Sequence, residues 1–68
     1  MNEHESLAVI GTLQDNGTPY PSLMVEGGGE WRLDIDQRYR HLLGGRVRVE
    51  GVREDFNVLA VIRIQAVR

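Results

Sequence analysis

The apolar residues of this chain fall into short runs separated by segments rich in glycine and polar residues. The first run covers residues 7–13 and is apolar at both odd and even positions. This pattern predicts a strand that is covered on both faces or that bends between two sheets. Gly11 inside the run is typical of a sharp bend or of a close approach between two backbones.

A tight turn is predicted after this strand. The sequence Asp-Asn-Gly-Thr at 15–18 favours a type I′ hairpin with Asn16-Gly17 at its centre, because both central residues tolerate positive φ. The second strand is then expected at about 18–26. Pro19 and Pro21 have no amide hydrogen, so a third strand can pair with the second only from about Ser22 onward.

Three glycines at 27–29 predict the second hairpin, with Glu26 opposite Glu30 and a third strand ending near Asp36. Two like charges in a cross-strand pair are unfavourable, so a shifted register or a bulge at the glycines is the alternative prediction. Alternation places Trp31 in the core. The outer face of the two strands then carries the following residues: Ser22, Met24, Arg32 and Asp34.

A short helix is predicted next. Asp34 and Gln37 have the spacing of a capping box, and Asp36 is an alternative N-cap. Gly44-Gly45 predicts the end of the helix, which has about seven residues and is too short to stand alone. It must therefore cover something apolar, such as one end of a barrel. The last two strands are predicted at 46–53 and 58–67.

Composition indicates one domain over residues 1–68, with residues 1–5 expected to be flexible. The chain has 41% hydrophobic and 26% charged residues and no cysteine, which excludes a disulfide framework. No apolar run approaches the roughly 20 residues of a membrane-spanning helix, and the polar start of the chain lacks the pattern of a secretory signal. We therefore expect a cytoplasmic protein that does not bind membranes.

The predicted order of elements resembles that of small bacterial OB-fold (oligonucleotide/oligosaccharide-binding) domains of uncharacterised families. The segment Leu-Leu-Gly-Gly-Arg-Val-Arg-Val-Glu-Gly at 42–51 resembles their helix end followed by a valine strand, and residues 9–13 resemble their first strand. The resemblance implies an all-β fold, a five-stranded OB-like Greek-key barrel with one short helix between strands three and four. An SH3-like barrel lacks a helix at that point.

For function, the resemblance implies ligands that cross the outer face of strands two and three: single-stranded nucleic acid, oligosaccharide, peptide or a partner protein. On that basis Tyr20 and Phe56 are candidates to stack on bases or sugars, and Arg32 to meet a phosphate. The alternative is that the aromatic rings cover the barrel ends and Arg32 pairs with Asp34. The candidate ligand-binding residues are Tyr20, Met24, Arg32, Arg48 and Phe56.

The charge balance argues against strong nucleic-acid binding. The net charge is −2, although all eight basic residues are arginines. Arg46, Arg48 and Arg53 form a basic strip, but Glu50 and Glu54 interleave with it, as on a solvated strand face. Nonspecific binding to phosphate backbones usually needs a clear basic excess.

The last strand suggests self-association. Leu59 and Val61 stand at odd positions, whereas Val58, Ala60 and Ile62 stand at even positions, so the two sets face opposite sides of the strand. A small barrel cannot easily bury both sets. An apolar patch at Leu59 and Val61, or edge pairing there, would produce a homodimer.

The sequence gives no indication of chemistry. His4 and His41 have no ligand partners at metal-site spacing, and no nucleophile and base can be paired. We expect no enzyme activity, no metal and no cofactor. The predicted function is a non-enzymatic OB-fold binding module that acts through self-association or a protein partner. The alternative is weak single-stranded nucleic-acid binding on the face of strands two and three.

Overall fold

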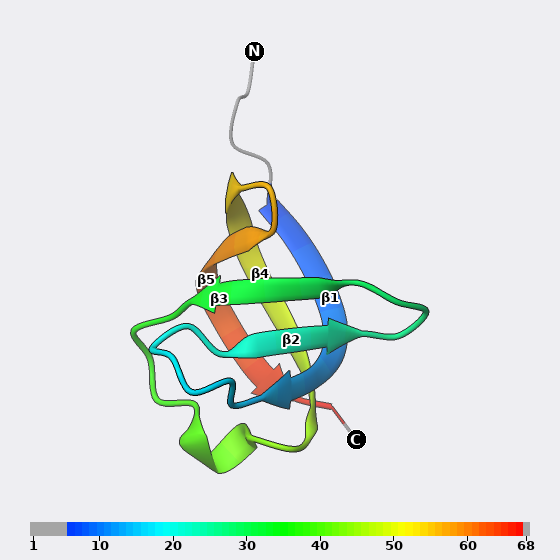
Figure 1. Cartoon of the computed structure of the whole chain (residues 1–68), viewed down its shortest axis with the longest axis vertical. Coiled ribbons are helices and arrows are strands. Elements are labelled where there is room, and N and C mark those ends of the chain that lie inside the picture. The colour runs from blue at the N-terminus through cyan, green and yellow to red at the C-terminus, as the bar shows by residue number, and fades with distance from the viewer. Residues whose placement is uncertain (1–5, 68) are drawn as a thin grey trace.

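The computed structural model describes residues 6–67, and most of them lie in β-strands (Figure 1). The strands are β1 (Ser6–Gln14), β2 (Ser22–Val25), β3 (Glu30–Asp34), β4 (Arg46–Asp55) and β5 (Val58–Ala66). A single 3-10 turn, η1 (Arg40–Leu42), stands between β3 and β4. Residues 1–5, for which flexibility is predicted, lie outside the described residues.

The strands form one sheet that closes into a barrel in the order β1-β2-β3-β5-β4. Neighbouring strands are antiparallel except β3 and β5, which are parallel. The all-β, five-stranded barrel with a short helical element between the third and fourth strands is therefore confirmed. The boundaries of the first, fourth and fifth strands agree with the predicted ranges to within two residues.

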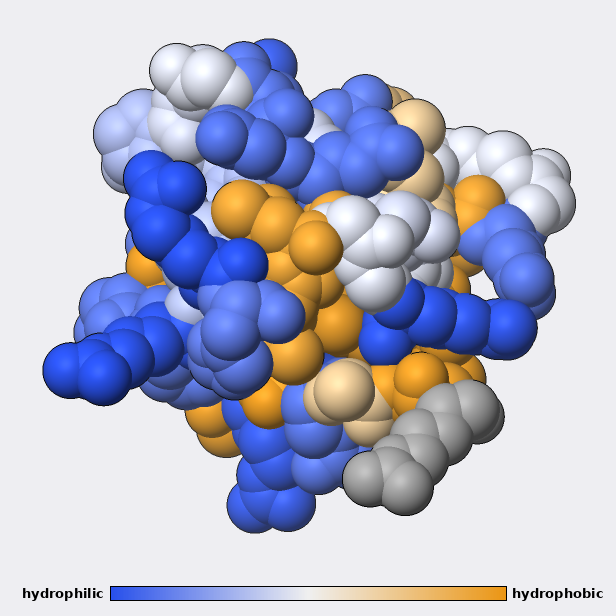
Figure 2. Space-filling view, turned by 90° about the horizontal axis from the view of Figure 1, so that it is seen from below, coloured by the Kyte–Doolittle hydropathy of each residue, from blue (hydrophilic) through white to orange (hydrophobic). Residues whose placement is uncertain are grey.

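Leucine and valine side chains fill the barrel. Alternation along each strand turns these residues inward, where they are fully buried: Leu13, Leu23, Leu33, Val47, Val49 and Leu59. Leu42 and Leu43 pack against this core from η1 and the residue after it, as do Ile35 and Tyr39 from the preceding loop. The lower end of the barrel carries apolar surface framed by hydrophilic side chains (Figure 2).

The predicted type I′ hairpin does not form. Gln14 pairs with Ser22, so residues 15–21 make a loop and the second strand is shorter than predicted. Asp15 accepts a hydrogen bond from the amide of Gly17 at 2.9 Å, and Asn16 accepts one from Thr18 at 3.0 Å. These local side-chain bonds compete with strand pairing.

The prolines nevertheless limit pairing as predicted. Ser22 opposite Arg32 is the last pair of β2 and β3 in that direction, and the amide of Leu33 donates to the Pro21 carbonyl at 2.9 Å. The register predicted for this hairpin is wrong by two residues, because Met24 pairs with Glu30 and not with Arg32. A shift by two keeps every side chain on its predicted face. It also separates Glu26 from Glu30.

The predicted helix of about seven residues is also wrong, since the observed element is the single turn η1. Asp34 is the last residue of β3, and no side chain caps η1. Gly44 does mark the end of the turn, with a φ of 85°.

Trp31 and the first strand differ partly from expectation. Trp31 is half-buried at the edge of the core, and the Arg53 guanidinium carbon lies 5.6 Å from the ring centroid. Ala8 and Ile10 face outward and are exposed, so β1 is not covered on both faces. The prediction for Gly11 is confirmed: a Cβ there would lie 2.4 Å from the Met24 carbonyl oxygen.

Two register shifts distort the β4–β5 ladder. Glu50 pairs with Arg63 but Gly51 pairs with Val61, which leaves Ile62 as an extra residue of β5. Leu59 and Val61 face the core before this bulge, and Ile64 faces it afterwards. The bulge thus explains why β5 is apolar at both parities. Leu59 is fully buried, so the self-association patch predicted at Leu59 and Val61 is misplaced, and the large apolar residue that β5 exposes is Ile62.

Candidate functional site

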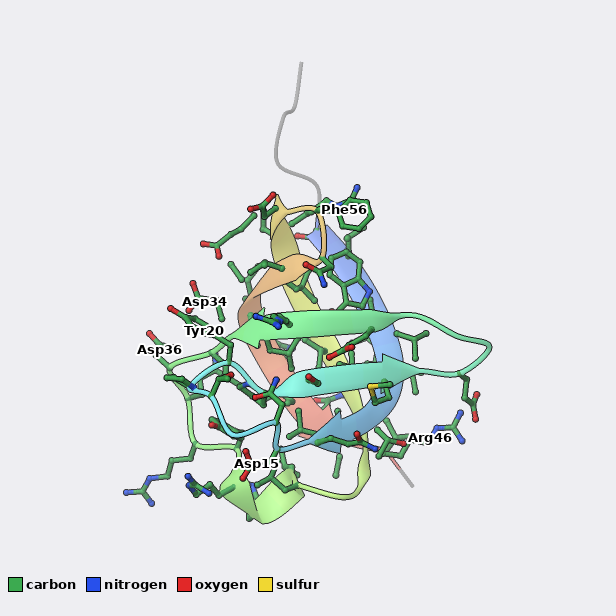
Figure 3. The ribbon with its side chains drawn as sticks, viewed as in Figure 1. Asp15, Tyr20, Asp34, Asp36, Arg46 and Phe56 are labelled. Carbon is green, nitrogen blue, oxygen red and sulfur yellow. The ribbon has the colours of Figure 1, made fainter. Side chains whose placement is uncertain are left out.

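A surface pocket of about 240 Å³ lies where three parts of the chain meet. The loop between β1 and β2 provides Tyr20, β3 provides Arg32 and Asp34, and the end of the β4–β5 hairpin provides Glu54 and Val58. Tyr20 and Asp34 lie close to one another beside the end of β3 (Figure 3). The pocket thus combines an aromatic ring, an aliphatic wall, two carboxyl groups and one guanidinium group.

Asn16 holds Tyr20 in place. Its side-chain amide donates to the Tyr20 carbonyl oxygen at 2.8 Å and to the Ser22 hydroxyl at 2.7 Å. The Ser22 hydroxyl donates in turn to a carboxylate oxygen of Glu30 at 2.6 Å, and Ser22 is buried beneath the loop. Thr18 also accepts a hydrogen bond from the amide of Tyr20 at 3.1 Å. Tyr20, which is 47% exposed, therefore stands on a loop whose backbone is held by side-chain hydrogen bonds.

A bulge directs Glu54 into the pocket. Arg53 pairs with Leu59 and Asp55 with Val58, so Glu54 is the extra residue of β4. Bulges commonly redirect a side chain in this way. Partial loss of hydration, a hydrogen bond with Asp34 and repulsion from that carboxylate all raise the pKa of Glu54.

Replacing Glu54 by glutamine is expected to raise the melting temperature at neutral pH. The ordinary pKa of a glutamate side chain is 4.5, and folding raises that of Glu54. Above pH 4.5 the unfolded chain loses this proton more readily than the folded protein does, so Glu54 destabilises the folded state. The gain should vanish below that pH. Thermal unfolding followed by circular dichroism at acidic and neutral pH measures it.

Glu26→Gln is the matched control. Glu26 is an exposed carboxylate 3.1 Å from Arg46, and the substitution changes the net charge by the same amount. Surface ion pairs of this kind contribute little, so the control should lower the melting temperature slightly or leave it unchanged. A gain from Glu54→Gln that is equal at both pH values would contradict the proposed contact with Asp34.

The predicted ligand-binding residues divide among three regions. Tyr20 and Arg32 line the pocket together. Met24 lies further along β2 on the outer face and is 38% exposed. Arg48 lies on β4, which borders neither β2 nor β3, and its guanidinium is 3.1 Å from Glu50.

Phe56 stands apart at the turn between β4 and β5 and is 83% exposed (Figure 3). Arg53 donates to the Phe56 carbonyl oxygen at 3.0 Å while its guanidinium lies over Trp31. Phe56 therefore belongs to the upper end of the barrel and does not line the Tyr20 pocket.

Two arginines of the predicted basic strip, Arg46 and Arg48, form ion pairs with glutamates, whereas Arg53 donates to the Phe56 carbonyl oxygen. Glu50 lies 3.1 Å from Arg48 and 3.8 Å from Arg63, and Arg46 is paired with Glu26. This agrees with the interpretation as a solvated strand face.

Within residues 6–67, no three His, Asp or Glu side chains are arranged to hold a metal ion, and no helix has the length and apolar character needed to cross a membrane. A hollow of about 430 Å³ lies along residues 37–41, but all its lining comes from that single segment.

Residues 10–67 match the model of a protein family described as "Protein of unknown function (DUF5818)". The chain belongs to this family. The match covers the second part of β1, all of β2 to β5 and every residue of the Tyr20 pocket. No curated protein and no solved structure matches the chain. The family assignment agrees with the resemblance to an uncharacterised small domain.

Sequence reasoning did not associate Glu54 or Val58 with Tyr20. Glu54 appears in the sequence only as one of the acidic residues between arginines. Its position depends on the bulge and on the parallel pairing of β3 with β5, in which Arg32 lies opposite Val58. No local motif marks either feature. Asp34 was predicted on the outer face and does line the pocket.

Proposed function

We propose that this chain is a non-enzymatic binding module of the OB type, and that its pocket receives a basic side chain of a protein partner. The observation that supports this most is the convergence of the Tyr20 ring with the carboxyl groups of Asp34 and Glu54 in one pocket. The cytoplasmic location stays a prediction from the sequence.

The chemistry of the pocket suits an arginine or lysine side chain. A cation placed over the Tyr20 ring gains cation–π attraction, and the carboxylates of Asp34 and Glu54 can accept its hydrogen bonds. Val58 offers an apolar wall to the methylene stem of such a side chain. Two carboxylates outnumber the guanidinium of Arg32, so at neutral pH the pocket attracts cations.

The position of the pocket supports an OB-type binding face. OB domains bind ligands over strands two and three, between the loops that join strands one to two and four to five. Tyr20 belongs to the first of these loops, Arg32 and Asp34 to β3, and Glu54 to the end of β4 beside the second loop.

Single-stranded nucleic acid is the second candidate ligand. Tyr20 and Arg32 lie in the same pocket, and together they could stack a base and contact a phosphate. The two carboxylates oppose this function, since they repel phosphates. The remaining predicted contacts, Arg48 and Phe56, lie outside the pocket.

Replacing Arg32 by alanine distinguishes the two functions, because they predict effects of opposite sign. Removing this positive charge should strengthen binding of a short oligoarginine peptide and weaken binding of oligo-dT. We expect roughly a threefold to tenfold tighter complex with the peptide. Isothermal titration calorimetry of wild type and variant with each ligand measures both changes.

Glu54→Gln supplies the complementary variant, with Glu26→Gln as its charge-matched control. The first should weaken the peptide complex by roughly threefold to tenfold, and the second should leave it nearly unchanged. Equal losses in both would show attraction to the overall charge alone and would refute a specific pocket. Salt-sensitive oligo-dT binding that weakens in Arg32→Ala would favour the nucleic-acid function instead.

A further inference from the structure

The second half of β5 has a strand neighbour on one side only. β3 pairs with β5 through Val58, Leu59 and Ala60, and the pairing ends there because β3 itself ends at Asp34. β4 continues along the other side as far as Ala66. The barrel thus leaves one edge of β5 open from Ile62 onward.

The register identifies which backbone groups point to the open edge. The amide of Val67 donates to the Arg46 carbonyl at 2.9 Å, so in this antiparallel ladder Arg63 and Gln65 also bond to β4. The backbone N–H and C=O groups of Ile64 and Ala66 therefore face away from β4. Among residues 6–67, no hydrogen bond to a backbone or side-chain group is found for them on that side.

The surface along this edge is accessible. Ala66 lies opposite the buried Val47, yet Ala66 itself is exposed, so the end of β5 is uncovered. Ile62 is 55% exposed at the start of the open edge. Its carbonyl oxygen points away from β4 and accepts a hydrogen bond from the side chain of Gln37 at 2.8 Å. A carbonyl oxygen has a second lone pair, which the Ala66 amide of another copy would use.

We propose that a second copy of this chain pairs with the open edge of β5, antiparallel about a two-fold axis at Ile64. In this register the backbone N–H and C=O groups of Ile64 form hydrogen bonds with those of Ile64 in the second copy. Ile62 lies opposite Ala66, and Arg63 lies opposite Gln65. The hydrogen bonds of the two edges satisfy each other, as in β-augmentation. The proposal does not depend on the Tyr20 pocket.

Self-complementarity is the reason for choosing a second copy as the occupant. A two-fold axis at Ile64 pairs the apolar Ile62 with the small Ala66 and brings no like charges together. Moving the axis by one residue to Arg63 would place two arginines opposite each other. The sequence of β5 therefore favours the register with the two-fold axis at Ile64 over the register with the axis at Arg63.

Amide hydrogen exchange measured at low and high protein concentration tests the dimer together with its interface. The amides of Ile64 and Ala66 should exchange more slowly as concentration rises, whereas those of Arg63 and Gln65, already bonded to β4, should change little. Sedimentation equilibrium on the same samples should show a monomer–dimer equilibrium. A strictly monomeric chain would overturn the proposal, as would a dimer in which exchange at Ile64 and Ala66 is unchanged.

Ile62→Glu is the variant for this test, with Ile10→Glu as its matched control. Both isoleucines are exposed, at 55% and 39%, and only Ile62 lies on the open edge. The first substitution should weaken dimerisation about tenfold or more, and the second should not. Equal weakening in both would overturn the β5 interface. Edge protection that appears only when a different polypeptide is added would assign the edge to another partner and would also overturn the proposal.

Discussion

Replacing Gly51 by alanine is expected to remove most of the stability of this domain. A Cβ at this position would lie 2.4 Å from the Ala60 carbonyl oxygen and 2.9 Å from Cγ of Leu59. The first of these atoms belongs to the backbone of the adjacent strand, so the β4–β5 ladder has to shift. We expect a loss of about 3 kcal/mol, the upper end of the usual cost of overpacking. A domain of this size has only about 3–5 kcal/mol in total.

Gly45→Ala is the control for this substitution. A Cβ at Gly45 would find its nearest neighbour, the Leu42 carbonyl oxygen, at 3.4 Å, and the backbone there is not in the left-handed region. The control should therefore change the free energy of unfolding by less than about 1 kcal/mol. Urea unfolding of both variants measures the difference. If Gly51→Ala were as stable as Gly45→Ala, the result would contradict the close approach of β4 to β5 at Gly51.

Leu59→Ala is expected to destabilise the domain by about 2–5 kcal/mol, the usual cost of emptying a leucine site in a packed core. Leu59 is fully buried among the other core leucines and valines. A substantial fraction of the variant should be unfolded even without denaturant, which far-ultraviolet circular dichroism and urea titration would reveal.

Ile62→Ala provides the comparison on the same strand. Ile62 is 55% exposed, so truncating it removes little buried surface and should cost less than about 1 kcal/mol. The sequence alone assigned Leu59 to the surface, and that assignment predicts the opposite order of effects. A Leu59→Ala variant that stays folded but becomes less prone to associate would support the sequence-based assignment over the structure.

The strands of the barrel could be predicted because short sequence patterns within each strand determine them. Alternation in residues 46–53 predicts a half-buried strand, and the observed β4 turns Val47 and Val49 inward. Pro19 and Pro21 have no amide hydrogen whatever the surrounding fold, so the limit on β2–β3 pairing follows directly. Gly11 fills its predicted role because the neighbouring backbone excludes even a Cβ.

The elements that were predicted wrongly depend on competition between local and distant contacts. Asn16 and Gly17 favour a type I′ turn, but the Asn16 side chain instead bonds to Tyr20 and Ser22 and keeps the loop open. The capping-box spacing of Asp34 and Gln37 has no effect because Asp34 is needed at the end of β3. At Asn16 one set of local bonds replaces another, whereas at Asp34 pairing between strands overrides the local preference.

Only part of the candidate site could be predicted from the sequence. Tyr20, Arg32 and Asp34 follow from the expected outer face, whereas Glu54 depends on a bulge that alternation cannot reveal. The same limitation applies to β5, where the bulge at Ile62 changes which parity faces the core. A one-residue irregularity moves every later side chain to the other face, and nothing in the local sequence marks it.

The most direct test of the proposed function is a titration of the isotope-labelled domain with a short oligoarginine peptide, followed by two-dimensional amide NMR. We expect the largest shifts at residues of the Tyr20 pocket, above all Tyr20, Asp34 and Glu54, and much smaller shifts in Glu54→Gln. Shifts centred instead on Glu26 or Glu50, or no shifts at all, would contradict a pocket that receives a basic side chain.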